Sequence, residues 1–405
     1  MTVRWNSADR VRRTGLGLGA RCVLWVSVAM ACVVGPQLAR DAAALALLGR
    51  LTAQHALDAL GARMLSDIEE RSGTLSVDGT IIRTRRYLPR HARTRIPSVV
   101  LLHGVHPQGI EEAHLVAFAR VLAASGLDVL TPELPELLSY RLEASTIGRI
   151  RALARAHARQ SALPAVGVIG ISFAGGLALM AAAEQPVRGA IAFVVSVGGH
   201  DDLLRLCRYY QGRDVRGPRG ERVQVAAHPY GARVMIREHL EHFVSSRDLP
   251  LAQRALDAYL HDRAAQARSL ALGLSESGRR VMSVLLDASQ REAMAQLLDT
   301  AVRSVREQLV AASPHGHLAS IRVPVFLIHG SDDPVIPSIE TRYLAQEIPP
   351  RWLRQTVITP LLRHTEFPEP PKLAQTWELV RFLKGMLDAA GSAARPTASS
   401  GGATR

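Results

Sequence analysis

The sequence is poor in cysteine and almost free of lysine. Three cysteines among 405 residues cannot build the disulfide framework that holds many small secreted domains together. Cys22 and Cys32 lie in an apolar N-terminal stretch, and Cys207 is expected to be a small packing residue. Lys372 and Lys384 are the lysines of the chain, so 47 of its 49 basic residues are arginines.

The formal net charge of +13 does not predict nucleic-acid binding. A surface that follows phosphates needs basic residues gathered on one face, and here the arginines are spread along the chain. Hydrophobic residues make up 47% of the sequence and charged residues 21%. These fractions are typical of a globular protein and exclude wholesale disorder and collagen-like repeats. No internal repeat is visible, and we expect no nucleic-acid partner.

The N-terminal region, residues 1–66, is predicted to be a membrane anchor or signal segment with a linking helix. Residues 1–21 hold five arginines against one acid, and residues 22–39 then run 18 positions without a charge. That length is close to the ~20 residues that cross a bilayer, and the basic flank should stay in the cytoplasm. A cleaved signal peptide and a buried core helix are the alternatives. Residues 41–66 have one mostly apolar side and predict the linking helix.

The middle of the chain alternates between short apolar runs and helical periodicity, which predicts an α/β fold with a mostly parallel sheet. Runs such as VVLLH and VFLIH are apolar throughout, as expected for strands covered by helices on both faces. The candidate strands are Thr80–Tyr87, Val99–His103, Asp128–Thr131, Val166–Gly170, Ala190–Val197, Val325–His329 and Gln355–Thr359.

The interval between the predicted strand that ends near Val197 and the one that starts at Val325 is too long for a single crossover connection, and its pattern is mostly helical. We therefore predict a helical cap insertion at residues 204–317. The sheet domain would comprise residues 67–203 and 318–390, and residues 391–405 would form a disordered tail.

Three motifs follow predicted strands and bear chemically useful side chains. Ser172 lies in Gly170-Ile-Ser-Phe-Ala-Gly-Gly176, between an apolar strand and a helical run. A serine at such a sharp turn exposes its hydroxyl above the sheet and directs the next amide, that of Phe173, toward a nascent oxyanion. A phosphate-binding P-loop is excluded, because no Lys-Ser/Thr pair follows the glycines. Asp332 and Asp333 follow the strand VFLIH, and either could orient an imidazole.

The third motif supplies the base. His364 lies in the loop after the last predicted strand, and a lone loop histidine would say little. Together, however, the serine, the acid and the histidine all follow the C-terminal ends of strands, where open α/β sheets bind ligands. Their order along the chain, Ser–Asp–His, is the order found in α/β hydrolases.

These motifs resemble those of the α/β-hydrolase superfamily and are similar to those of bacterial esterases and lipases. The resemblance spans roughly residues 75–203 and 318–388. It implies Ser172 as nucleophile, Asp333 rather than Asp332 as acid, and His364 as base. It also implies that the residue after His103-Gly104, which is Val105, donates the second oxyanion amide beside that of Phe173.

The sequence departs from the family at three of these motifs. The segment His103-Gly-Val-His-Pro-Gln-Gly109 differs from the HGGG of one esterase group. Ala174 stands where the second glycine of G-x-S-x-G is usual, and Thr-Glu-Phe follows the histidine without the Gly-Phe often found there. The departures put the subfamily in question more than the catalytic groups.

The resemblance implies a serine hydrolase that cleaves carboxylic esters, small-molecule or lipid-like, without a metal or organic cofactor. An acyltransferase with the same three residues and a non-catalytic, membrane-associated binding protein are the alternatives. With an N-terminal anchor, or after export, the catalytic domain would lie outside the cytoplasm on the periplasmic side.

Two further segments could contribute to the site or to packing. Asp201 and Asp202 are better explained as helix caps than as substrate ligands. His228, Tyr230 and Met235 of the insertion could line a pocket or could pack in a helical core.

Overall fold

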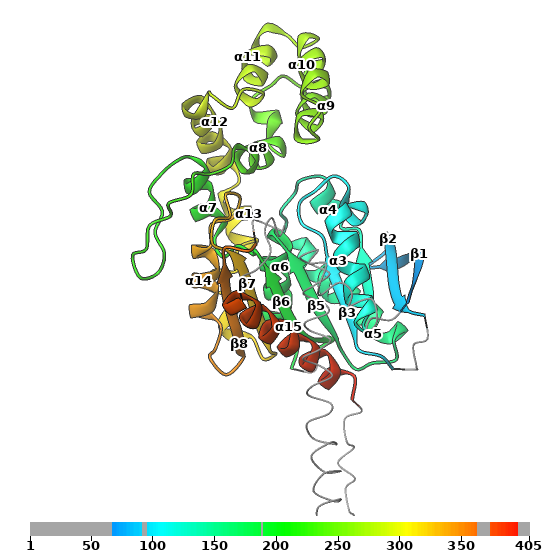
Figure 1. Cartoon of the computed structure of the whole chain (residues 1–405). Helices are drawn as coiled ribbons and strands as arrows, with labels where there is room; N and C mark the ends of the chain where they lie inside the picture. Colours follow the sequence, from blue (N-terminus) through cyan, green and yellow to red (C-terminus); the bar gives the residue numbers. More distant parts are fainter. Residues whose placement is uncertain (1–66, 91–94, 188, 363–372, 396–405) are drawn as a thin grey trace, which may run out of the picture. The chain divides into compact units, whose positions relative to one another are not determined.

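The computed structural model describes residues 67–90, 95–187, 189–362 and 373–395, and it contains one eight-stranded sheet (Figure 1). Six of its strands are parallel to their neighbours, and the first two form an antiparallel hairpin that joins the sheet through β2. The strands are β1 (Ile68–Val77), β2 (Thr80–Pro89), β3 (Ser98–Leu102), β4 (Asp128–Pro132), β5 (Val166–Ile171), β6 (Ile191–Val197), β7 (Val325–Gly330) and β8 (Leu353–Thr359).

The strands lie in the order β1-β2-β4-β3-β5-β6-β7-β8. Residues of β3 and β7 are buried along their whole length, which explains why their sequences are apolar on both faces. Because β5, β6 and β7 are parallel neighbours, the segments that follow them leave the sheet at one edge.

Helices cover both faces of the sheet (Figure 1). One face packs against α3 (Ala113–Ala124) and α15 (Leu373–Ala393) in one apolar cluster, and the other packs against α5 (Ser145–Gln160), α6 (Phe173–Ala183) and α14 (Ile339–Glu347). The short helix α4 (Pro135–Leu138) follows β4. The α/β class and the mostly parallel sheet are therefore confirmed.

All seven strands expected from the sequence are present, and β1 was missed. Most residues of β1 are exposed or half-buried, so its sequence has no apolar alternation to detect. The usable signal was Asp78-Gly79, whose positive φ values of 48° and 75° make the tight turn that pairs β1 with β2. An Asp-Gly pair is a strong hairpin signal.

Between β6 and β7 the chain forms a helical insertion. Its helices are α7 (Leu203–Tyr210), α8 (Pro229–Arg237), α9 (Leu249–Leu260), α10 (Ala264–Leu272), α11 (Glu276–Leu285), α12 (Arg291–Ser304) and α13 (Arg306–Ala311). Asp202 caps α7 by accepting the amides of Leu204 and Arg205, which confirms one of the two predicted caps. Asp201 is not a cap, because its carboxylate accepts from the Arg205 guanidinium instead. Cys207 on the same helix is buried, in agreement with a packing role.

A buried ion-pair network joins the start of this insertion to the sheet domain. The Arg205 guanidinium donates to Glu340 on α14 at 2.7 Å and to Asp201 at 2.7 Å. Glu340 also accepts the backbone amides of Asp201 and Asp202, each at 2.9 Å. Burial, together with the charge of Glu340, raises the pKa of Asp201 to about 7. One guanidinium thus holds two carboxylates, and the network fixes the direction in which α7 leaves the sheet.

Two end-of-chain expectations have different outcomes. Helix α15 continues to Ala393, three residues into the stretch for which the sequence predicted a disordered tail. Ala390 is buried there and the Ser392 hydroxyl donates to the carbonyl of Asp388, so packing and a local hydrogen bond extend the helix.

The predicted N-terminal membrane segment, residues 1–66, lies outside the described residues. Within the described part of the chain, each helix is too short or too polar to cross a membrane.

Candidate active site

Ser172 occupies a sharp turn between β5 and α6. Its backbone has φ of 55° and ψ of −131°, a conformation that costs a non-glycine residue about 1–3 kcal/mol. Two backbone hydrogen bonds hold it: the Ser172 amide donates to the carbonyl of Val197 on β6 at 2.7 Å, and the Gly175 amide donates to the Ser172 carbonyl at 2.8 Å. The strained conformation is therefore fixed from both the sheet and the helix.

Small residues are found on both sides of the serine, and the steric requirement differs between the positions. A Cβ atom on Gly170 would fall 2.3 Å from the carbonyl oxygen of Ala174, so position −2 of the turn excludes any side chain. Ala174 replaces the glycine that is more usual in this motif. Its side chain is buried in the core and the turn still forms, so the methyl group is compatible with this architecture.

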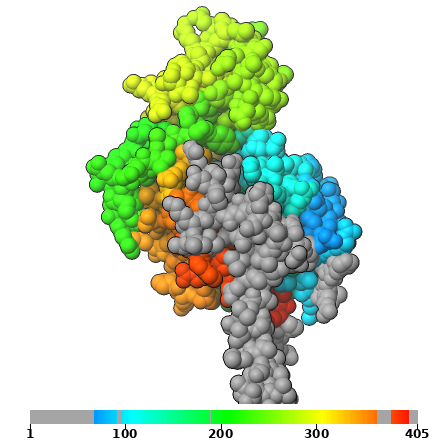
Figure 2. Space-filling view, viewed as in Figure 1, coloured from blue at the N-terminus to red at the C-terminus, as the bar shows by residue number. Residues whose placement is uncertain are grey.

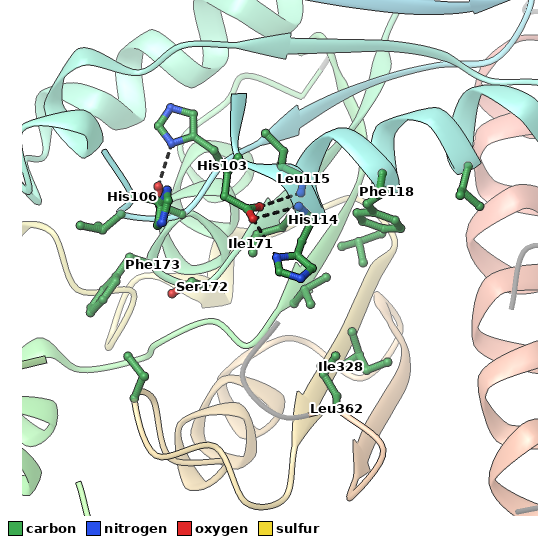
Figure 3. Close-up of a pocket in the computed structure, with 18 of the residues that line it drawn as sticks. His103, His106, His114, Leu115, Phe118, Ile171, Ser172, Phe173, Ile328 and Leu362 are labelled. Carbon is green, nitrogen blue, oxygen red and sulfur yellow. Dashed lines mark hydrogen bonds and ion pairs between the residues drawn. The ribbon is translucent and has the colours of Figure 1, made fainter. Parts of the chain in front are cut away.

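A cavity of about 740 Å³ opens at Ser172 and is large enough for a small organic ligand. Figure 3 shows Ser172, Phe173 and His106 toward one end, with Phe118, Ile328 and Leu362 farther away. The far part is apolar and lies along the sheet face covered by α3 and α15. Its lining includes Leu115, Phe118, Val121, Ile171, Val195, Val197, Ile328, Leu362, Leu379, Phe382, Leu383 and Met386.

The loop after β3 is held by a buried histidine. The Nδ1 atom of His103 donates to the Gly104 carbonyl at 2.7 Å, and its Nε2 atom accepts the amide of Leu134 at 2.9 Å. These two bonds fix a neutral ring, and burial lowers the pKa of His103 to about 4. His103 therefore connects the ends of β3 and β4 and positions the segment that contains Val105.

Val105 and Phe173, the residues expected to supply oxyanion amides, both line this cavity. Phe173 is the first residue of α6, so its amide is one of the four that lack an acceptor within the helix. Tyr230, from α8 in the insertion, donates its hydroxyl to the Val105 carbonyl at 2.9 Å. Burial raises the pKa of Tyr230, which keeps this hydroxyl protonated as a donor. The insertion thus contacts the loop that holds Val105.

The structure distinguishes the two candidate acids. Asp333 is buried, whereas Asp332 is exposed. The Oδ1 atom of Asp333 accepts the amides of Val335 and Ile336 at 2.8 Å and 3.0 Å, which fixes the orientation of the carboxylate. His329 Nε2 lies 3.5 Å from the other oxygen and donates to the Ile336 carbonyl at 2.7 Å.

His364, the expected base, lies outside the described residues. Other histidines do line the cavity: His106, His114 and His228. Sequence reasoning identified His228 and Tyr230 as possible lining residues, and both line the cavity, whereas Met235 packs in the core. His106 and His114 were missed. His106 could have been predicted to line the cavity from its position three residues after His103, in the same loop.

Two groups of side chains in the described part of the chain have the composition of a metal site. They are His239, Glu241 and His242 in one place, and Asp201, His315 and Glu347 in another. Asp201 is already engaged by Arg205, and neither group belongs to the cavity at Ser172.

Comparison with solved structures finds proteins with a similar arrangement at low sequence identity. A 2,6-dihydroxy-pseudo-oxynicotine hydrolase is 18% identical with a TM-score of 0.44, and the alignment covers 81% of this chain and 72% of the other. A putative dienelactone hydrolase from Klebsiella pneumoniae is 12% identical with a TM-score of 0.42, covering 80% and 99%. MGS-M2, an α/β hydrolase from a Medee basin deep-sea metagenome library, is 13% identical with a TM-score of 0.40, covering 80% and 98%.

The sequence matches no family model and no curated protein. We therefore assign the fold from the strand order and from the serine turn between β5 and α6. The fold is that of the α/β hydrolases.

The buried His103 predicts a loss of stability in acid. Its pKa is about 6.5 in the unfolded chain and about 4 in the fold. Above pH 6.5 the ring is neutral in both states, so the free energy of unfolding is not reduced there. As pH falls from 6.5 to 4, about 3 kcal/mol of the free energy of unfolding should be lost. Urea unfolding of wild type and His103→Gln from pH 7 to pH 4 measures this: the variant should show a shallower dependence by that amount. His317→Gln, at an exposed position, should keep the wild-type dependence. Equal pH dependence in wild type and His103→Gln would contradict the assignment.

Proposed function

We propose that the protein is a serine hydrolase that cleaves carboxylic esters through an acyl-enzyme intermediate. The observation that supports this most directly is the strained turn at Ser172, which opens into a cavity of about 740 Å³. A non-glycine residue with positive φ at a strand-to-helix turn is costly, and such strain is concentrated at functional sites.

In the proposed mechanism the Ser172 hydroxyl oxygen attacks the ester carbonyl carbon while His364 takes its proton. The amides of Val105 and Phe173 stabilise the resulting oxyanion. His364 then gives the proton to the leaving alcohol, and the acyl group stays bonded to Ser172. A water molecule, deprotonated by the same histidine, attacks the acyl-enzyme and releases the carboxylic acid. Asp333 holds the imidazole in the required tautomer and stabilises it when charged.

The position of Asp333 supports its proposed role. Asp333 follows β7, and Ser172 follows β5, with β6 between them and all three strands parallel. Two backbone amides fix the buried carboxylate, whereas Asp332 is exposed to solvent. An acid that orients an imidazole needs such a fixed direction, because a mobile carboxylate would not select one tautomer.

The apolar part of the cavity supports esters with a hydrocarbon acyl group. Phe118 of α3, Ile328 of β7 and Phe382 of α15 line it without a charged group among them. Burial of each methylene contributes about 0.8 kcal/mol. With p-nitrophenyl esters of graded chain length, kcat/KM is therefore expected to rise from acetate to longer chains.

The two alternatives use the same residues. An acyltransferase would deacylate with an alcohol in place of water, and a binding protein would use the cavity without chemistry. A fluorophosphonate probe separates the binding protein from both enzymes, because it reacts with an activated serine.

The first prediction from this proposal concerns Ser172 and Asp333. Wild type should be labelled by a fluorophosphonate, and Ser172→Ala should not. Asp333→Asn, whose Oδ1 can still accept the two amides, should retain the fold and lower kcat about 10³–10⁴-fold, because the wrong tautomer is favoured. Asp332→Asn is the matched control and should stay within about twofold of wild type, as expected for an exposed residue. Unlabelled wild type would favour the binding protein, and equal losses in the two aspartate variants would refute the assignment of the acid.

The second prediction concerns Tyr230. Tyr230→Phe removes the hydrogen bond to the Val105 carbonyl, a bond of about 1 kcal/mol, and loosens the peptide that directly follows the one whose amide should bind the oxyanion. We expect kcat and the rate of fluorophosphonate labelling to fall about threefold to tenfold with little change in KM. Tyr343→Phe is the control, since its hydroxyl bonds the Arg216 carbonyl on an exposed surface. An unchanged kcat in Tyr230→Phe would show that this contact does not position Val105.

We also propose that residues 1–66 attach the enzyme to the membrane with the catalytic domain on the periplasmic side. The support is the uncharged run of 18 residues after a basic flank. The full-length protein should stay with membranes after extraction with alkaline carbonate, and a chain starting at residue 67 should be released. Release of both would indicate a cleaved signal or a soluble protein.

A further inference from the structure

The loop that follows β3 borders the end of the cavity nearest Ser172. A Cβ atom on Gly104 would fall 3.1 Å from the Cβ atom of Ser172, so the backbone of this loop passes directly beside the serine. His106 is two residues farther along, which places its Cα atom within about 7 Å of that of Gly104. Its side chain lines the cavity at the end where Ser172 and Phe173 lie, away from Phe118 (Figure 3).

A hydrogen bond from the backbone fixes the tautomer of His106. The Gln108 amide donates to the Nδ1 atom of His106 at 3.3 Å, so this nitrogen is an acceptor and bears no proton. Burial lowers the pKa of the His106 imidazole below its usual value of 6.5, so the ring is neutral at pH 7. Because a neutral imidazole has one N–H group, the proton of His106 is on Nε2.

The Nε2–H group of His106 is available to a ligand. Among the described residues it has no hydrogen-bond partner, and Nε2 is not one of their fully enclosed polar atoms. The ring is half-buried and lines the cavity, so a molecule bound at Ser172 can reach this donor. A ligand that displaces water from the donor without supplying an acceptor would leave the N–H group unpaired, which costs free energy.

Neighbouring polar side chains at this end of the cavity have partners within the protein. Both nitrogens of His103 are bonded to the backbone. Tyr230 belongs to the insertion, whose residues run from green to yellow in Figure 2, and its hydroxyl donates to the Val105 carbonyl. His114 donates from Nδ1 to the Glu112 carboxylate at 2.8 Å, and this carboxylate also accepts two amides of α3. These contacts distinguish the neighbours from the Nε2–H group of His106.

We propose that His106 is a specificity-determining residue whose Nε2–H group donates a hydrogen bond to an acceptor in the alcohol portion of the ester. This inference rests on the hydrolase activity proposed above. The acyl and alcohol portions lie on opposite sides of the scissile bond, and the apolar part of the cavity, around Phe118, suits a hydrocarbon acyl group. The alcohol portion then lies at the end that contains His106. The favoured substrates are esters of alcohols that have an ether, carbonyl or hydroxyl oxygen.

The first experiment compares esters in which an ether oxygen replaces a methylene group at nearly constant shape. The pairs are 2-methoxyethyl and butyl hexanoate, and 3-methoxypropyl and pentyl hexanoate. The measured quantity is the ratio of kcat/KM for the ether ester to kcat/KM for the alkyl ester. In at least one pair this ratio should be about threefold to tenfold higher in wild type than in His106→Leu, the effect of one neutral hydrogen bond. His106→Gln restores a donor and should keep part of the preference.

Two controls accompany these ratios. His317→Leu, at an exposed position outside the cavity, should keep the wild-type ratios. Butyl 3-methoxypropanoate and butyl pentanoate have the ether oxygen in the acyl portion instead, and their ratio should be the same in wild type and His106→Leu. A change confined to this acyl pair would overturn the placement of the donor beside the alcohol. Equal losses of kcat/KM for all esters in His106→Leu would also overturn it, since His106 would then act on the shared carbonyl.

The second experiment tests the tautomer and does not depend on catalysis. Full-length protein is labelled with 15N-histidine, and a long-range 1H–15N correlation spectrum is recorded at pH 7. The signal of His106, assigned by its loss in His106→Gln, should show an imidazole protonated at Nε2. A ring protonated at Nδ1 would overturn the proposal, because Nε2 would then be an acceptor.

Failure of this proposal can be distinguished from failure of the hydrolase proposal. Wild type that hydrolyses none of the esters and is not labelled by a fluorophosphonate would overturn both. Hydrolysis of the esters with ratios that are the same in wild type and His106→Leu would overturn the role of His106 alone.

Discussion

The backbone conformation of Ser172 is the constraint on which the rest of the site depends. A positive φ at a non-glycine residue is unfavourable by itself, and it persists here because β6 and α6 each hold one side of the peptide by a hydrogen bond. The same turn requires the absence of a side chain at Gly170 and begins α6 at Phe173, which lines the cavity. A strand order that aligns β5, β6 and β7 then places Asp333 at the same edge of the sheet.

The helical insertion takes part in the site as well as covering it. Arg205 and Glu340 join its first helix to α14, and Tyr230 joins α8 to the loop that contains Val105. These contacts link the position of the insertion to the geometry of a proposed oxyanion donor. A change in the insertion could therefore alter turnover without touching the serine, which is a route by which one fold serves many substrates.

Two buried arginines of the insertion are stabilised in different ways. Arg205 donates to two carboxylates, so its desolvation is offset by ion pairs within the protein. Arg233 has one carbonyl and one aromatic ring as neighbours and a donor left over. The Arg205 guanidinium is thus satisfied by carboxylates of the protein. Arg233 leaves its buried Nη2 atom without a hydrogen-bond partner among the described residues, and Asp287 interacts with it only electrostatically.

The sequence by itself determined the buried strands and the serine turn, because both depend on local rules. Runs such as VVLL are apolar on both faces, and a serine flanked by Gly170 and Gly175 satisfies the sterics of one tight turn. The edge strand β1 escaped detection because exposed strands need no apolar pattern. Only the tertiary structure decided which distant residues meet. Tyr230 and the Val105 carbonyl are 125 positions apart, and Arg205 and Glu340 are 135 apart. Such contacts depend on how a long insertion folds back on the sheet, and no periodicity along the chain encodes that path.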